Sequence, residues 1–252
     1  MKKQHLITRR NAIITGLTSL GGLLLTGCTK KGPPTYGNLL RMGDALTYNA
    51  HRILLPGQAL AKEYQHKDIS SFPATGTTNP GDLTNRGDHA IPYNEVYGRL
   101  HKGEFSDWGL LVEGRVARPN TYSLRDLRRF PARTQITRHT CEEGWTAIAE
   151  WTGVPLSLVL QQAGILPSAR FVNFYAYDGY MESIDMLDAF HPQTILAYGM
   201  NGGDLPVPHG APVRLRVETQ IGYKSVKFLQ RIVVTDEFVD TGDSGWSWYV
   251  GI

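Results

Sequence analysis

The chain has 252 residues, of which 41% are hydrophobic and 19% are charged, so it is long enough for a substantial core and has an ordinary globular composition. This composition excludes an intrinsically disordered chain. The formal net charge of +3 reflects 26 basic against 23 acidic residues, and the leader alone holds Lys2, Lys3, Arg9 and Arg10. The rest of the chain is therefore about neutral, and its charge gives no indication of nucleic-acid binding.

Residues 1–27 have the pattern of an export signal. The basic start MKKQHLITRR is followed by the apolar stretch AIITGLTSLGGLLLTG, which is too short and too interrupted for a stable transmembrane span. The pair Arg9-Arg10 resembles a twin-arginine signal, and LTGC at 25–28 resembles a bacterial lipobox that leaves Cys28 as a lipidated N-terminus. We therefore expect a lipid-anchored protein on the periplasmic or another extracytoplasmic membrane face. An uncleaved N-terminal helix is the alternative.

Residues 28–92 are expected to form a tether and an N-terminal extension. Glycine and proline at 32–37 predict a flexible or extended spacer from the membrane. A short helix is predicted at 51–65. The stretch 70–90 is rich in Gly, Pro, Ser, Thr and Asn and predicts a long surface loop.

Regular elements are predicted from Trp108 onward. Their order, with no regular βαβ repeat and no glycine-rich nucleotide motif, predicts an α+β fold. Asn201-Gly202 predicts a hairpin within 194–207. Helices are predicted at 121–131, where Ser123 can cap, at 153–164, where Gly164 follows the last turn, and at 185–190. Strands are predicted at 108–116, 135–141, 170–178, 211–219 and 224–236.

Cys141 is the first candidate for chemistry. The chain has two cysteines, and a lipidated Cys28 leaves Cys141 without an intramolecular disulfide partner. Such a thiol is either buried and inert or held by a metal as thiolate, and a chain that is exported folded suits a preloaded cofactor. His139 lies two positions earlier on the same strand face, but a zinc site needs three or four ligands in a recognisable set, which the sequence lacks.

Basic residues near the end of the chain predict an anion site. Arg214 and Arg216 share a strand face, and Lys224 and Lys227 follow Gly222. Arginine and lysine at this density suit a phosphate, and backbone amides near the glycine can add to such a site. A solvated strand face is the alternative interpretation.

Four blocks in this region resemble the cofactor-binding segments of the sulfite-oxidase family of molybdenum enzymes. They are YMESI at 180–184, LAYGMNG at 196–202, HGAPVR at 209–214 and GYKSVK at 222–227, in the family's order. YNEVYG at 93–98 is similar to a segment of the family's periplasmic methionine-sulfoxide-reductase branch. The resemblance spans about 93–252 and implies the mixed-sheet sulfite-oxidase fold, as one catalytic domain without a haem domain or an immunoglobulin-like dimerisation domain.

The resemblance also implies a molybdenum–molybdopterin cofactor and a set of site residues. Cys141 would ligate the metal and act in catalysis with Tyr180, which follows the turn Asp178-Gly179 and would donate a hydrogen bond near the metal. The implied cofactor-binding residues are Asn94, Tyr97, Gly98, His209, Arg214, Ser225, Val226 and Lys227.

The residues after the cysteine favour one reaction over another. Sulfite oxidases follow their cysteine with A-G-N-R-R, whereas Cys141 precedes Glu142-Glu143-Gly144-Trp145 and lacks those cationic groups. We therefore expect two-electron oxygen-atom transfer, with reduction of an S- or N-oxide such as methionine sulfoxide. Sulfite oxidation is the enzymatic alternative, and a non-catalytic lipoprotein that retains the fold is another. With no C-x-x-C-H or flavin motif in the sequence, electrons are expected from a separate cytochrome or membrane haem subunit.

Overall fold

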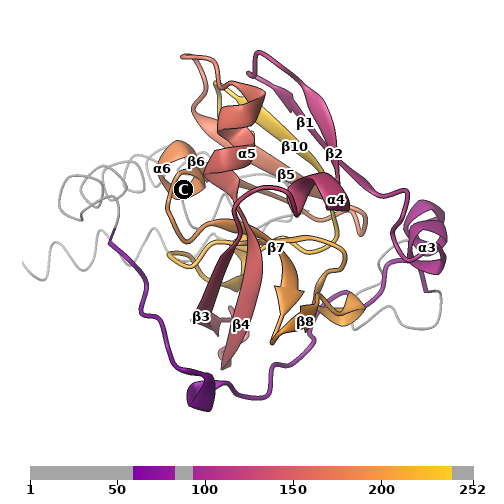
Figure 1. Ribbon diagram of the computed structural model, residues 1–252, viewed down its shortest axis with the longest axis vertical. Helices are drawn as coiled ribbons and strands as arrows, with labels where there is room; N and C mark the ends of the chain where they lie inside the picture. Colours follow the sequence, from indigo (N-terminus) through magenta and orange to yellow (C-terminus); the bar gives the residue numbers. More distant parts are fainter. Residues whose placement is uncertain (1–58, 83–92, 240–252) are drawn as a thin grey trace, which may run out of the picture. The chain divides into compact units, whose positions relative to one another are not determined.

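A computed structural model describes residues 59–82 and 93–239 of this chain (Figure 1). The predicted export signal, the lipobox with Cys28 and the spacer at 32–37 lie outside these residues. No helix within the described ranges is long and apolar enough to cross a membrane. The described part is built on two five-stranded sheets.

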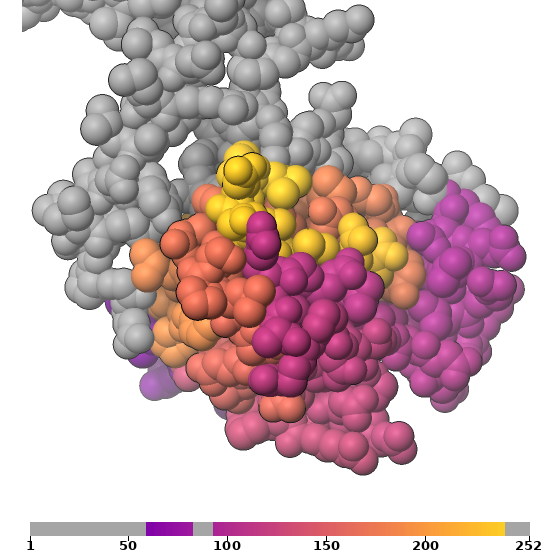
Figure 2. All heavy atoms as spheres, turned by 90° about the horizontal axis from the view of Figure 1, so that it is seen from above, coloured from indigo at the N-terminus to yellow at the C-terminus, as the bar shows by residue number. Residues whose placement is uncertain are grey.

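The first sheet has the strand order β2-β1-β10-β5-β6. β1 and β10 are parallel, and the other neighbours are antiparallel, so the sheet is mixed as predicted. The pairing joins segments far apart in sequence, and in Figure 2 residues near the end of β10 (yellow) lie beside magenta residues that follow β1. The strands span Asn120–Ser123 (β2), Gly109–Gly114 (β1), Leu229–Thr235 (β10), Phe171–Ala176 (β5) and Met181–Asp185 (β6).

The second sheet has the order β3-β4-β7-β8, and β9 also pairs with β7. All of its pairings are antiparallel. Every residue of β7 is buried, which explains its continuous apolar sequence ILAYGM. The strands span Arg133–Thr140 (β3), Thr146–Pro155 (β4), Ile195–Met200 (β7), Gly203–Asp204 (β8) and Arg214–Arg216 (β9).

Short helices connect the sheets. Ser123 caps α4 as predicted, because its Oγ accepts a hydrogen bond from the Asp126 backbone at 3.2 Å. α5 ends at Gly164, whose φ of 73° lies in the left-handed region that favours glycine. The helices are α3 (Glu95–Lys102), α4 (Leu124–Leu127), α5 (Leu156–Ala163) and α6 (Met186–Ala189), with 3-10 turns η1 (His66–Asp68), η2 (Val207–His209) and η3 (Gly222–Lys224).

The main apolar core joins α5 to both sheets. It includes Trp108 and Leu160, which are 1% and 0% exposed, together with inward residues of β1, β5, β7 and β10. The Trp108 indole donates to the Leu229 carbonyl at 3.0 Å, so its burial leaves no unpaired N–H. A smaller cluster around Trp151 lies beneath the region of the candidate site.

Most of the predicted elements form, but α3 and β6 were not predicted, and β2 occupies the first residues of the helix predicted at 121–131. The helix predicted at 51–65 is wrong for 59–65, which is extended because the Gln193 side chain donates to the Ala61 carbonyl and accepts from its N–H, at 3.0 and 2.8 Å. The strand predicted at 224–236 begins at Leu229, since η3 and Phe228, with a φ of 53°, occupy its first positions. β4 was not predicted at all.

Candidate active site

A cavity of about 610 Å³ lies where several loops meet at the strand ends. Its wall contains most of the residues that the sequence predicted for the site, brought together from distant positions. These are Cys141, Tyr180, His209, Arg214, Ser225, Val226 and Lys227.

Cys141 follows the last residue of β3 and opens a tight turn. Its N–H donates to the Trp145 carbonyl at 2.9 Å, and Gly144, with a φ of 89°, donates back to its carbonyl at 3.1 Å. The Sγ atom lies 3.6 Å from Glu142 Oε2 and 3.7 Å from Glu143 Oε2. Burial, reinforced by both carboxylates, raises the pKa of the thiol to about 11. The thiol can therefore serve as a thiolate at neutral pH only where a metal cation replaces its proton.

Arg214 and Lys227 bring positive charge into the same cavity, where Asp178 and Glu143 act on Lys227 and Glu218 acts on Arg214 without forming an ion pair with either. Arg214 donates to the carbonyls of His209 and Ser225 at 3.0 and 2.8 Å. Lys227 Nζ donates to three further carbonyls, among them that of Thr75 at 2.9 Å. Within the described ranges neither side chain forms an ion pair. Burial, with repulsion from neighbouring arginines, lowers the pKa of Arg214 to about 9 and that of Lys227 to about 7.

His209 lies between these two cations. Burial, followed by repulsion from Arg214 and Lys227, lowers its pKa to about 4, so the imidazole is neutral at physiological pH. Gly210, with a φ of 106°, lets this turn approach Lys227, because a Cβ there would lie 2.8 Å from the lysine Cβ. The turn and the lysine are therefore packed as one unit.

Tyr180 projects a hydroxyl group at the cavity wall. The hydroxyl donates to the Tyr223 carbonyl at 3.0 Å. Burial raises the pKa of Tyr180, so it keeps its proton and remains a hydrogen-bond donor over the physiological range. The turn Asp178-Gly179 before it forms as the sequence predicted.

Three predicted cofactor residues do not line this cavity. Asn94 caps α3 by accepting from the Tyr97 N–H at 2.9 Å and donates to the Tyr177 carbonyl at 2.7 Å. The buried Tyr97 hydroxyl donates to the Ala211 carbonyl at 2.7 Å. Gly98 packs so closely on Gly81 that a Cβ on Gly81 would lie 2.5 Å from the Gly98 Cα. In this structure they fix α3 beside the segment that leads into β9, and their contact with a cofactor stays a prediction.

The segment 72–77 is a part of the site that the sequence did not reveal. It has no helix or strand, as predicted, yet it is more than a surface loop because all six of its residues line the cavity. The Phe72 ring contacts His139, Trp145, Trp151 and His209 at centroid distances of 5.2–5.6 Å. Phe72, the only aromatic residue between Gln65 and Ala90, was the only signal in the sequence.

The donor set of the cavity fits a molybdenum–pterin group with a phosphate end. The described ranges contain no group of three or more His, Cys, Asp or Glu side chains arranged for a metal ion. A metal held by Cys141 would therefore need most of its ligands from outside these residues. A cofactor that brings the remaining ligands and an anionic phosphate matches both the lone thiol and the buried cations Arg214 and Lys227, neither of which forms an ion pair within the described ranges.

Comparison with known proteins agrees with this donor set. Residues 97–241 match the sequence model of the family described as oxidoreductase molybdopterin binding domain. The match covers more than half of the chain, and the chain belongs to this family. It is therefore an enzyme, a molybdopterin-dependent oxidoreductase, and the predicted sulfite-oxidase relationship is confirmed.

Individual relatives indicate which branch of the family the chain is similar to. The chain is 32% identical over 247 residues to a protein of Azospira oryzae provisionally named protein-methionine-sulfoxide reductase subunit YedZ1, across 96% of this chain and 87% of the relative. It is 34% and 31% identical to the protein-methionine-sulfoxide reductase catalytic subunits MsrP of Ralstonia nicotianae and Pseudomonas syringae pv. tomato. These two alignments cover 52% of this chain and 44% of each MsrP, so the chain spans less than half of their length.

A solved structure confirms the fold. The sulfane dehydrogenase SoxCD from Paracoccus pantotrophus superposes with a TM-score of 0.51 and 22% identity, over 85% of this chain and 59% of that chain. At this identity the similarity supports the architecture alone. The predicted α+β, mixed-sheet sulfite-oxidase fold is confirmed.

Proposed function

We propose that the protein reduces an S- or N-oxide by two-electron oxygen-atom transfer, with a sulfoxide such as methionine sulfoxide as the preferred class. One observation carries the choice of substrate. The carboxylates of Glu142 and Glu143 lie 3.6 and 3.7 Å from the Cys141 sulfur, so the metal end of the cavity is acidic. Such surroundings repel sulfite and accept a neutral oxide. The names of the relatives support the same class.

The residues of the chain divide the work between binding and orientation. Cys141 would hold the metal, and Arg214 and Lys227 would hold the phosphate end, with His209 between them. When bound, the molybdenum–pterin group supplies the two-electron redox chemistry. Reduction of a sulfoxide consumes two electrons and two protons and yields a sulfide and water. Tyr180 retains its hydroxyl proton, and its O–H would donate to a ligand in the cavity by turning away from the Tyr223 carbonyl.

We also propose where the protein is located and which class of protein supplies its electrons. The twin-arginine and lipobox patterns support export of the folded chain and attachment through Cys28, on an extracytoplasmic membrane face. Electrons would come from a separate redox protein, such as a cytochrome or a membrane haem subunit, which agrees with the word subunit in the relatives' names.

The test is a substrate comparison on protein purified from its native host. We expect reduction of methionine sulfoxide or another neutral oxide with an artificial electron donor, and little oxidation of sulfite. Cys141→Ser should abolish turnover and leave the circular dichroism spectrum nearly unchanged. Faster turnover of sulfite than of any oxide would reject the proposed direction, and full activity in Cys141→Ser would remove the cysteine from the mechanism.

A charge variant gives a sharper check of substrate choice. Glu143→Gln removes one negative charge beside the sulfur and should raise the enzyme's activity on sulfite relative to its activity on a sulfoxide. Glu113→Gln is a matched control. Glu113 lies on β1, accepts a hydrogen bond from Arg231 and does not line the cavity, so its replacement should leave this ratio unchanged.

A further inference from the structure

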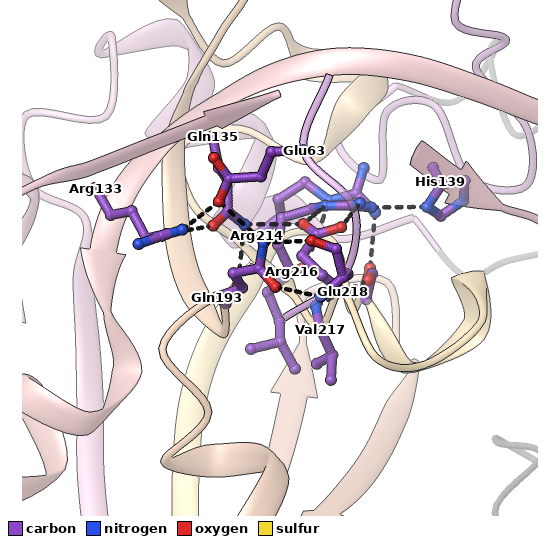
Figure 3. A network of polar contacts seen from close by, with 12 residues as sticks. Glu63, Arg133, Gln135, His139, Gln193, Arg214, Arg216, Val217 and Glu218 are labelled. Atoms are coloured by element: carbon purple, nitrogen blue, oxygen red, sulfur yellow. Dashed lines mark hydrogen bonds and ion pairs between the residues drawn. The ribbon is translucent and has the colours of Figure 1, made fainter. Parts of the chain in front are cut away.

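A buried hydrogen bond fixes the tautomer of His139. Arg216 Nη1 lies 2.7 Å from His139 Nδ1 (Figure 3). A guanidinium group can only donate, so Nδ1 must be the acceptor and the ring proton must be on Nε2. His139 is therefore a permanent N–H donor through Nε2.

The position of Arg216 is itself tightly determined. Its Nε and Nη2 donate to the two carboxylate oxygens of Glu218 at 3.0 and 2.8 Å, and the exposed fractions of the two side chains are 1% and 0%. Its guanidinium lies 4.5 Å from the Trp151 ring centre, and Gln135 donates to Glu218 at 3.1 Å. A fully buried ion pair costs desolvation energy, so it contributes more to placing groups than to stability.

The free edge of the His139 ring faces the cavity beside Cys141. A Cβ on Gly222 would lie 2.7 Å from His139 Nε2 and 3.2 Å from Glu142 Oε2, so both atoms border the same point of the cavity wall. Glu142 Oε2 in turn lies 3.6 Å from the Cys141 sulfur. Among the described residues Nε2 has no hydrogen-bond partner, which leaves this donor for a ligand.

Besides the Glu142 carboxylate, two aromatic rings lie beside this donor. Phe72 and Trp145 lie 5.2 and 5.4 Å from the His139 ring, and 5.6 Å from each other. A neutral sulfoxide or N-oxide carries one strongly accepting oxygen on an otherwise apolar centre. One fixed N–H in an aromatic wall complements that pattern, since sulfur and methyl groups pack well on aromatic rings.

We propose that His139 binds the oxide oxygen of the substrate through Nε2–H, and that Arg216, held by Glu218, is the positioning residue that fixes its tautomer. This inference rests on the proposed reduction of an oxide and names a residue that determines its specificity. The acceptor is the oxygen that the reaction removes, so the hydrogen bond orients that atom in the cavity beside Cys141.

The first test is independent of activity. Long-range proton–nitrogen correlation spectra of the metal-free protein at neutral pH report which ring nitrogen of a histidine carries the proton. The signals lost in His139→Gln identify this ring among the 8 histidines. We expect a protonated Nε2 and an unprotonated Nδ1. A proton on Nδ1, or a doubly protonated ring, overturns the inference whatever the enzyme reduces.

The second test is kinetic and uses the loaded enzyme. His139→Leu should lower kcat/KM for a sulfoxide about tenfold, the value of one hydrogen bond, with unchanged molybdenum content and paramagnetic signal. His139→Gln keeps an N–H donor and should recover part of the loss. A role in folding alone would reduce metal content and activity together, and wild-type kcat/KM in His139→Leu overturns the inference.

The positioning role has its own variant. Arg216→Met combined with Glu218→Leu removes the ion pair without leaving a buried charge, so the fold is expected to survive. It should lower kcat/KM as much as His139→Leu, and adding His139→Leu should cause no further loss. Arg231→Met, which removes a half-exposed pair with Glu113 and a contact with the Tyr175 ring, is the control and should match the wild type.

The two claims fail in different ways. An enzyme that reduces no oxide overturns the proposed function and with it the assignment of the oxide oxygen, even where the spectra show the expected tautomer. An enzyme that reduces oxides at the wild-type rate in both His139→Leu and the paired Arg216 and Glu218 variant overturns only this inference.

Discussion

Cys141, Arg214 and Lys227 line one cavity but favour ligands of opposite charge: the thiolate favours a cation, and the two basic side chains favour an anion. The thiol has a pKa of about 11 and does not ionise by itself, while burial and repulsion from a neighbouring arginine lower the pKa values of the two cations. A ligand with a metal cation at one end and a phosphate at the other satisfies both demands. Each of the three buried side chains is therefore expected to destabilise the empty protein more than the protein with its cofactor bound.

The cations should bind a simple anion in the metal-free protein. Inorganic pyrophosphate at about 100 times its Kd should stabilise the protein by about 2.7 kcal/mol and raise the midpoint of thermal unfolding by several degrees. Arg214→Met should remove this shift, and Arg231→Met should retain it. Equal shifts in the wild type and in Arg214→Met would contradict the phosphate-binding role of Arg214.

The Cys141 thiol should be slow to react in the metal-free protein. With a pKa of about 11, the thiolate fraction, and hence the alkylation rate, should rise about tenfold per pH unit from pH 7 to beyond pH 10. The measurement uses Cys28→Ala, which leaves Cys141 as the only thiol in the chain. A rate that stops rising below pH 9 would show that burial and the two glutamates do not raise the pKa.

At the scale of elements, the features that depend on neighbouring residues, such as helix ends and tight turns, could be predicted from the sequence. The Ser123 cap of α4, Gly164 after α5 and the Asn201-Gly202 hairpin follow from short-range rules and were predicted correctly. β4 was missed because Gly153 and Pro155 at its end suggest the start of a helix, although its burial alternates as a strand requires.

Contacts between distant residues could not be predicted in this way. Arg216 and His139 are 77 positions apart, and Lys227 and Thr75 are 152 apart, so no spacing rule brings them together. The resemblance to the family identified the residues around Cys141 and Lys227, but it gave no indication of the segment 72–77. That segment has no periodicity, and only its long-range contacts place it.

The packing of segment 72–77 can be measured through Phe72. Phe72→Ala removes ring contacts with His139, Trp145, Trp151 and His209 and should lower the free energy of unfolding by about 2 kcal/mol, roughly half the cost at a fully buried site. Urea unfolding measures this loss, and limited proteolysis should cut faster within 72–77.

A matched control separates this packing from ring removal in general. Phe190 on the end of α6 is 37% exposed, so Phe190→Ala should cost clearly less free energy and leave proteolysis at 72–77 unchanged. Equal losses in the two variants would show that Phe72 does not anchor the segment.

At the scale of the whole molecule, the site should make stability depend on pH. The pKa of His209 is about 4 in the folded protein and 6.5 in the unfolded chain, so the unfolded chain binds more protons between these two pH values. Stability therefore rises with pH across this window and is lost below it. Lys227, at about 7 against 10.5, extends the rise above pH 7, while the raised pKa of Asp178 acts in the opposite direction at acid pH.

Unfolding of the metal-free protein by urea at several pH values tests this prediction. We expect increasing stability from pH 4 to pH 9. His209→Asn should flatten the acid part of the profile and Lys227→Met the part above pH 7. His101→Asn and Lys102→Met, at exposed positions of α3, are the controls, and a profile unchanged by the site variants would contradict the burial effects at His209 and Lys227.

The proposed membrane attachment concerns the whole chain and rests on the sequence alone. Cys28→Ala should move the protein from the membrane fraction to the soluble extracytoplasmic fraction without loss of oxidoreductase activity, because the residue lies far outside the catalytic domain in sequence. Fractionation of cells followed by immunodetection measures this change. An unchanged membrane fraction would contradict lipidation at Cys28.

The central claim is that one thiolate and a cationic cavity hold a molybdenum–pterin cofactor. The most direct measurement is metal and pterin analysis of the protein purified from its native host, compared with Cys141→Ser. We predict molybdenum and pterin in equal amounts in the wild type, and loss of the characteristic paramagnetic signal in the variant. A wild-type protein that contains neither would contradict the account and would favour a lipoprotein that retains the fold without the chemistry.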